Sequence, residues 1–172
     1  MFKWTNGKIR GVVVITPDEF EDYRGSYIET YDEKKYNSII GEIKFVQDDI
    51  SISAKDVLRG IHGNYVTSKL VSVLNGSVYS VIVDNRPDSE TYRKWEAFIL
   101  SGNNKKQLFI PHGIGNSILS LEDNTIYFYK QTTSYEPNSQ FTLKWDDPEL
   151  NIWWPIKSPI LSERDFFGKY KE

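Results

Sequence analysis

The sequence predicts a mainly β protein built as an antiparallel sandwich or barrel. Short apolar or alternating runs recur along the chain, and residues that favour turns separate them. Aromatic residues make up 15% of the composition, which suits a β body with an aromatic lining. At 172 residues the chain is long enough to bury a sizeable core, so we expect a single domain.

The expected elements follow one another at short intervals. Only residues 32–40 and 163–170 have a helical pattern, and both stretches are short. Turn-forming residues occupy 75–76, 86–88, 101–104, 111–113 and 122–124. The expected strands are 9–15, 26–31, 43–47, 69–83 with its internal turn, 95–100, 107–110, 117–121, 125–129 and 140–145.

The turn inside 69–83 is the strongest local signal. The runs 69–74 and 77–83 are rich in β-branched residues and flank the dipeptide Asn75-Gly76. An Asn-Gly pair between two such runs is typical of a type I′ turn, so we expect a β-hairpin here.

The residues just before this turn carry the most informative chemistry. Residues 58–62 form the end of an expected strand and include a glycine and His62. In the sequence, His62 lies between two cationic residues, Arg59 and Lys69. A lone histidine is more often a packed or surface residue than a catalyst. The combination on a β framework indicates a group for acid/base chemistry and anion binding.

Composition excludes several classes of function. The net charge is −3 and the pI is near 5.5, which disfavours a general nucleic-acid binder. The chain has no cysteine, so disulfides and thiolate nucleophiles are excluded. No apolar run is long enough for a membrane span, and the first residues lack the apolar region of a signal peptide. We therefore expect a cytoplasmic protein that does not bind membranes.

Ordered motifs run along nearly the whole chain, including VLRGIH, LSGNNKKQLFIPHG, YFYKQTTSYEP, KWDDP and LSERD. On these motifs, across residues 9–165, the chain resembles the dTDP-4-dehydrorhamnose 3,5-epimerase family. The resemblance implies a cupin-like antiparallel β jelly roll with short peripheral helices. We expect a jelly-roll body at about 9–146 and, because of its tryptophan-rich segments, a C-terminal cover at about 147–172. The resemblance further implies a homodimer, a nucleotide-diphosphate sugar as substrate and no cofactor.

The histidine count agrees with the absence of a metal that the resemblance implies. Metal-binding cupins use about three histidines and a carboxylate, whereas this chain has only His62 and His112. We therefore expect no metal at the site.

By resemblance, His62 is the catalytic base and Tyr129 the acid facing it. A 4-keto group acidifies the C–H bonds at C3 and C5, so a base can form an enolate and an acid can return the proton from the other side. The resemblance also pairs Asp165 with His62 and places Lys69 against the C4 oxygen. From the residues alone, Asp165 would instead be an exposed acid in a charged tail.

The resemblance assigns further residues to substrate binding. Arg59 and Arg24 would hold the diphosphate, and the segment that contains Phe20, Arg24 and Glu29 would reach toward a neighbouring subunit's site. For Phe20 and Tyr135, core packing is an equal alternative. The complete substrate-binding set is Arg59, Arg24, Glu29, Phe20, Gln47, Asn116 and Tyr135.

Departures from the family pattern bear on the substrate. Asn116 stands where the family commonly has a second histidine, so Asp84 would lose that histidine as a partner. Gly63 and the short loop that follows it would leave room for a bulkier sugar. Asn116, the short HGNY loop and the segment from YKQTT to SQFTLKW resemble the branch that acts on GDP-4-keto-6-deoxy-heptose in capsule polysaccharide synthesis. We therefore expect a 3,5-epimerase of that sugar. The alternatives are a dTDP-4-dehydrorhamnose 3,5-epimerase, a 3,4-ketoisomerase or a non-catalytic sugar-binding cupin.

Overall fold

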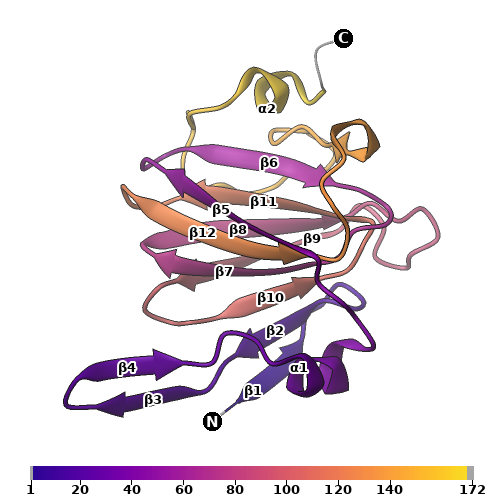
Figure 1. Cartoon of the computed structure of the whole chain (residues 1–172). Helices are drawn as coiled ribbons and strands as arrows, with labels where there is room; N and C mark the ends of the chain where they lie inside the picture. The colour runs from indigo at the N-terminus through magenta and orange to yellow at the C-terminus, as the bar shows by residue number, and fades with distance from the viewer. Residues whose placement is uncertain (1, 170–172) are drawn as a thin grey trace.

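The computed structural model describes residues 2–169 and consists mainly of β-strands (Figure 1). The helical elements are α1 Glu33–Ile40, α2 Glu163–Phe167 and the short 3-10 turn η1 Pro137–Ser139. The strands are β1 Lys3–Asn6, β2 Val13–Thr16, β3 Glu19–Asp22, β4 Gly25–Ile28, β5 Gln47–Ser53, β6 Leu58–Gly63, β7 Lys69–Asn75, β8 Ser77–Asp84, β9 Trp95–Ser101, β10 Gln107–Ile110, β11 Ile114–Ser120, β12 Thr125–Gln131 and β13 Phe141–Thr142.

Two antiparallel sheets pack against each other. One has six strands in the order β1-β2-β10-β7-β12-β5, and the other has five in the order β13-β6-β11-β8-β9. Inward-facing side chains of both sheets meet in the main core, because alternate residues of a strand point to the same side. Examples are Val71 and Leu108 from the first sheet and Val78 and Ile82 from the second, all buried. The expected antiparallel β fold is confirmed.

The hairpin expected at Asn75-Gly76 is wrong. β7 pairs with β10 and β12, whereas β8 pairs with β11 and β9, so the turn joins strands of opposite sheets. Gly76 does have a positive φ of 75°, which explains the glycine. The dipeptide signals a tight change of direction, but it does not determine whether the two strands pair.

Other boundaries also differ from the expected ones. The strand expected at 43–47 instead begins at Gln47 and runs to Ser53. β1 and β3 had not been expected, and the strand expected at 140–145 shrinks to two residues. Both helices are present: Asp32 caps α1 and Ser162 caps α2, each through its side chain. The end expected for the second helix, residue 170, lies outside the described residues. None of the described helices is long and apolar enough to cross a bilayer.

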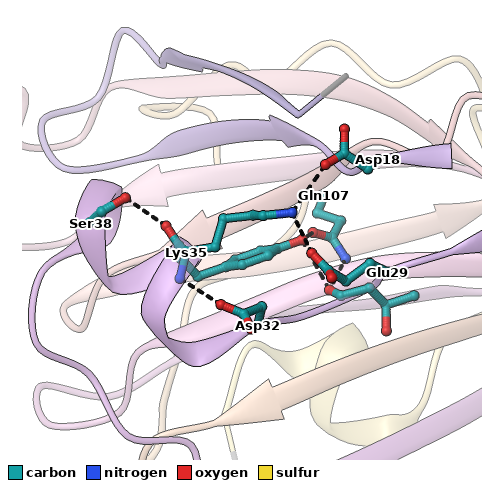
Figure 2. Close-up of polar contacts among 8 residues, drawn as sticks. Asp18, Glu29, Asp32, Lys35, Ser38 and Gln107 are labelled. Carbon is teal, nitrogen blue, oxygen red and sulfur yellow. Dashed lines mark hydrogen bonds and ion pairs between the residues drawn. The ribbon is translucent and has the colours of Figure 1, made fainter.

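The hairpin of β3 and β4 extends away from the two sheets (Figure 1). Figure 2 shows how its base is held: Lys35 of α1 contacts Asp18, just before β3, and Glu29, just after β4. Beneath this contact the buried Tyr36 hydroxyl lies 2.7 Å from Gln107 Oε1, which belongs to β10. The hairpin is therefore anchored through α1 to the six-stranded sheet.

The segment after β13 covers the outer face of the five-stranded sheet. Leu150 is buried against Val81 and Val83, with Trp154 packed against the same cluster. The chain then returns along β6, where Ile160 forms a bridge with Val57, and enters α2. This path places α2 above β6 in Figure 1, on the side of the molecule away from the hairpin of β3 and β4.

Candidate active site

A cavity of about 590 Å³ lies between the two sheets, beside the main core, where α2 and the segment before β13 border it. A volume of this size suits a small-molecule site. Its walls are formed by Gln47, Asp49 and Ser51 of β5; Leu58, Arg59 and His62 of β6; Lys69 of β7; Asn116 and Ile118 of β11; Tyr127, Tyr129 and Gln131 of β12; and Val57, Tyr135, Gln140, Ile160, Leu161, Ser162, Arg164 and Asp165.

A β-bulge in β6 directs two of the expected site residues into this cavity. His62 is opposite Asn116, and Arg59 is opposite Ile118, so two residues of β6 face the single residue between them on β11. In a regular strand, residues three apart point to opposite faces. The extra residue in β6 removes this constraint, and both Arg59 and His62 line the cavity.

Two glycines make this arrangement possible. Gly60 has a φ of 115°, and a Cβ there would lie 2.6 Å from the Asn116 carbonyl oxygen. At Gly63 a Cβ would lie 2.5 Å from the Phe141 ring. Glycine at 63 therefore accommodates Phe141 of β13, and the extra space for a larger sugar that we expected beside Gly63 is filled.

The imidazole of His62 contacts the carboxylate of Asp165. His62 Nε2 lies 2.5 Å from Asp165 Oδ1, and Asp165 is only 3% exposed. The Ser162 hydroxyl, which caps α2, accepts a hydrogen bond from the Asp165 amide and fixes the first turn of the helix. The contact implied by the resemblance is present, and the alternative of an exposed acid is wrong.

Burial and the contact between the two side chains have opposite effects on the pKa of His62 and on that of Asp165. Burial lowers the pKa of His62, and the hydrogen bond that His62 donates to Asp165 only partly offsets this effect, so the imidazole has a pKa below its ordinary value. Burial raises the pKa of Asp165, but the hydrogen bond and charge of His62 outweigh it and leave that pKa below its usual range. Near neutral pH the pair is a neutral imidazole beside a carboxylate.

Lys69 extends from β7 into the same cavity without an ion-pair partner among the described residues. Burial lowers the pKa of its ammonium group to about 8, and the charge of Asp49 partly opposes that effect. Its Nζ lies 5.3 Å from the centre of the Tyr129 ring. A desolvated cation of this kind can stabilise a nearby anion strongly.

Tyr129 belongs to the sheet opposite His62. It lies on β12 and His62 lies on β6, so the two side chains enter the cavity from different walls. Burial raises the pKa of the Tyr129 hydroxyl, and the nearby Asp49 raises it further. The phenol therefore keeps its proton at neutral pH, as a proton donor must.

Asn116, Gln47 and Tyr135 also line the cavity, as expected. The Asn116 side-chain amide donates to the Tyr127 hydroxyl at 3.0 Å. Gln47 Oε1 accepts from the Tyr135 backbone amide at 2.8 Å, which holds the segment after β12 against β5. The structure thus gathers His62, Asp165, Lys69, Tyr129, Arg59, Gln47, Asn116 and Tyr135 around one space.

Three expected substrate-binding residues do not line this cavity. Phe20 is 59% exposed on the β3–β4 hairpin, and Arg24, at the hairpin's tip, pairs with Asp22. Glu29 contacts Lys35 within the same chain (Figure 2). The expectation that this segment serves a neighbouring subunit's site stays a prediction.

Asp84 is not hydrogen-bonded to Asn116, which stands where the family commonly has the histidine partner of this aspartate. Its hydrogen bonds are with other residues. It is fully buried and accepts hydrogen bonds from Arg86, Ser89 and Thr91. Burial raises the pKa of its carboxyl, but these hydrogen bonds outweigh burial and hold that pKa far below its usual range. Asp84 anchors the loop between β8 and β9.

Sequence reasoning missed two charged residues of the cavity, Asp49 and Arg164. Arg164 donates through Nε to Thr142 Oγ1 at 2.9 Å. Its signal was the sequence Ser162-Glu-Arg-Asp165, a helix-capping pattern that fixes which residues of the first turn face the body. Among residues 2–169, no group of three or more His, Cys, Asp or Glu residues is arranged to hold a metal ion.

Comparison with known proteins identifies similar sequences and folds. The family model described as dTDP-4-dehydrorhamnose 3,5-epimerase matches residues 6–170. The dTDP-4-dehydrorhamnose 3,5-epimerase of Escherichia coli K12 is 40% identical over 163 residues, which cover 92% of this chain and 88% of that protein. The dTDP-4-dehydrorhamnose 3-epimerase of Streptomyces niveus is 34% identical, with 91% of this chain and 78% of that protein covered.

A solved structure agrees with these sequence matches. The dTDP-6-deoxy-D-glucose-3,5-epimerase of Legionella pneumophila, in complex with dTDP-4-keto-L-rhamnose, superposes with a TM-score of 0.94 and 38% identity. The superposition covers 98% of this chain and 92% of that one. The expected cupin-like β fold is confirmed over nearly the whole chain.

Proposed function

Because the chain belongs to the dTDP-4-dehydrorhamnose 3,5-epimerase family, we propose that it inverts C3 and C5 of a dTDP-linked 4-keto-6-deoxy sugar. The family makes it an isomerase that acts on a nucleotide sugar. The observation that carries the proposal is the placement of His62, paired with Asp165, and Tyr129 on opposite walls of one cavity. Inversion requires removal of a proton from one face of a carbon and delivery to the other.

The proposed base is Nδ1 of His62. Asp165 is a carboxylate near neutral pH and can only accept a hydrogen bond, so Nε2 of His62 carries the proton that lies between them. The lone pair of the neutral imidazole is then on Nδ1. When that nitrogen takes a proton from C3 or C5, Asp165 stabilises the imidazolium that forms.

Lys69 and Tyr129 complete the reaction. Loss of the proton moves an electron pair to the C4 oxygen, and the Lys69 ammonium stabilises the resulting enolate. The Tyr129 hydroxyl then delivers its proton to the opposite face of the same carbon, which re-forms the ketone. Water restores the proton of Tyr129 and accepts the one from His62, so no net proton is consumed.

The cations at the cavity suit the diphosphate. Arg59 is exposed on β6, donates through Nε to Ser53 Oγ at 3.0 Å, and lines the cavity. Arg164 of α2 adds a second guanidinium group. Guanidinium groups bind phosphate oxygens in bidentate fashion, so this pair would fix the nucleotide end of the substrate.

Two arguments favour a dTDP-linked sugar over the GDP-linked heptose that the sequence departures had suggested. The curated relatives named above have dTDP-linked substrates by name, at 34% to 40% identity. Gly63 also leaves no extra space for a larger sugar, because Phe141 occupies the space beside it. Asn116 remains the feature that favours the heptose, and capsule synthesis remains part of that second candidate. A homodimer also stays a prediction.

Competition between the two sugars tests the proposal. The enzyme is incubated with equal amounts of dTDP-4-keto-6-deoxy-glucose and GDP-4-keto-6-deoxy-heptose, and the products are followed by NMR. We expect the dTDP-linked sugar to be inverted with at least about tenfold higher kcat/KM, equivalent to roughly 1.4 kcal/mol in the transition state. Faster inversion of the heptose would assign the enzyme to the second candidate, and migration of the carbonyl would make it a ketoisomerase.

A further inference from the structure

We propose that Asp49 is a positioning residue that keeps Lys69 in its ammonium form inside the cavity. The inference rests on the proposed function, because it concerns the charge that would stabilise the enolate. Asp49 is a carboxylate in a cavity whose proposed substrate is an anion. Such a carboxylate repels a diphosphate, so its presence needs a reason of its own.

The alternation of β5 places Asp49 in the cavity. Gln47, Asp49 and Ser51 line the cavity, while the intervening residues face outward. The neighbouring carboxylate, Asp48, is on the outer face and pairs with Lys130 at 2.8 Å. Two adjacent carboxylates of one strand therefore have opposite environments.

Hydrogen bonds fix the Asp49 carboxylate on the wall that carries Lys69. Its Oδ2 accepts from Gln47 Nε2 at 2.7 Å and from Gln131 Nε2 at 2.8 Å. Asp49 lies opposite Tyr129 in the strand register, and Gln131 lies opposite Lys69. The carboxylate is thus held in place across β12 from Lys69 of β7, by one glutamine of its own strand and one of β12.

None of the other charged groups among the described lining residues of the cavity stabilises the ammonium form of Lys69. Arg59, His62 and Arg164 are cationic or become cationic, so their charge opposes protonation of Lys69. Asp165 is committed to His62. The hydroxyls of Tyr127 and Tyr129 are neutral because burial raises the pKa of both. Asp49 is therefore the remaining carboxylate among the described lining residues that can balance Lys69.

Burial and the charge of Asp49 have opposite effects on the pKa of Lys69. Burial lowers the pKa of Lys69 to about 8, and Asp49 is the charge that raises it toward that value. Removal of the charge would lower the pKa further, so a larger part of Lys69 would be neutral near pH 7. A neutral amine stabilises an enolate less well than an ammonium ion does.

The variant Asp49→Asn tests this role, with Asp48→Asn as the matched control one residue away. Asparagine keeps the shape of the side chain and one acceptor oxygen for the glutamine amides, but it removes the charge. We expect the alkaline limb of the kcat/KM profile to move to lower pH by on the order of one unit in Asp49→Asn. The alkaline limb should keep its wild-type position in Asp48→Asn and return toward that position in Asp49→Glu.

Competitive labelling with acetic anhydride gives a second readout that needs no substrate. The pH dependence of Lys69 acetylation, measured by mass spectrometry, reports the pKa of its amine in each folded variant. We expect a lower midpoint in Asp49→Asn than in the wild type and in Asp48→Asn.

The outcomes separate this inference from the proposed function. A wild-type enzyme that inverts the sugar, with the same alkaline limb and the same labelling midpoint in Asp49→Asn, would overturn the inference alone. A wild-type enzyme without epimerase activity would contradict the proposed function, while the labelling shift would still report whether Asp49 acts on Lys69. If Asp49→Asn and Asp49→Ser both failed to fold, Asp49 would belong to the framework and the inference would be wrong.

Discussion

His62 and Asp165 are 103 residues apart in the sequence, and their side chains meet at 2.5 Å. The first lies on β6, and the second lies on a short helix near the end of the chain. The β-bulge of β6 directs the histidine into the cavity, and the capped first turn of α2 brings the carboxylate to it. The pair that we propose as the catalytic base is therefore assembled only when the C-terminal segment has docked.

His62→Asn should abolish catalysis, because asparagine cannot take up a proton near neutral pH. We expect deuterium exchange at C3 and C5 to fall by about a hundredfold to ten-thousandfold, the usual contribution of a general base. Exchange is measured by NMR in deuterated water, and circular dichroism checks the fold. The matched control is His112→Asn, which changes the other histidine, on an exposed turn. Near-normal exchange in His62→Asn would sink the assignment of the base.

Tyr129→Phe should separate exchange from inversion. The variant keeps His62 and Lys69, so it can still remove and return a proton on one face, but it lacks the donor on the other face. We expect measurable deuterium exchange with inversion reduced by about a hundredfold or more. Tyr92→Phe, a change of an exposed tyrosine outside the cavity, serves as the control. If Tyr129→Phe formed the inverted product at the wild-type rate, another group would be the acid.

The pH profile of kcat/KM should be bell-shaped. His62 must be neutral, and burial places its pKa below the ordinary 6.5, so activity rises as the pH increases through that lowered value. Lys69 must be protonated, and its pKa is about 8, so activity falls as the pH rises above about 8. A plateau that continued without decline to pH 10 would show that an ammonium group is not needed.

Tyr36→Phe should destabilise the fold without changing the chemistry of the cavity. Its hydroxyl donates to Gln107 Oε1, and both side chains are buried, so the variant leaves an unpaired acceptor. We expect a loss of about 1 to 3 kcal/mol in the free energy of unfolding, measured by urea titration. Tyr23→Phe, at an almost fully exposed position, should change it by much less. Equal stability of Tyr36→Phe and the wild type would show that the bond contributes little.

The parts of the fold that sequence reasoning found are those with an apolar inner face. β7, β8 and β12 line the main core, and their runs were recognised at nearly the right places. β5 was misplaced because its pattern is reversed. Gln47 and Asp49 face inward to the cavity, while Ile50 and Ile52 are exposed on the outer face. A strand that lines a polar cavity does not show the usual alternation, so Asp49 was missed together with its strand.

Contacts between residues far apart in the sequence could not be predicted from local patterns. An Asn-Gly turn marks a reversal of direction, but it carries no information on whether β7 and β8 belong to one sheet. The residues alone likewise favoured an exposed Asp165, since nothing local indicates that α2 docks against β6. The resemblance to a family supplied that contact, and it also supplied Tyr129. Lys69, by contrast, was indicated by the residues themselves, together with Arg59 and His62.

Deuterium incorporation by the wild-type enzyme is a direct test of the proposed epimerase activity. The enzyme is incubated with dTDP-4-keto-6-deoxy-glucose in deuterated water, and NMR follows the hydrogens on C3 and C5 together with the configuration of the product. We expect deuterium at both carbons and formation of the doubly inverted sugar. A sugar that is recovered unchanged, with hydrogen retained at both positions, would contradict it.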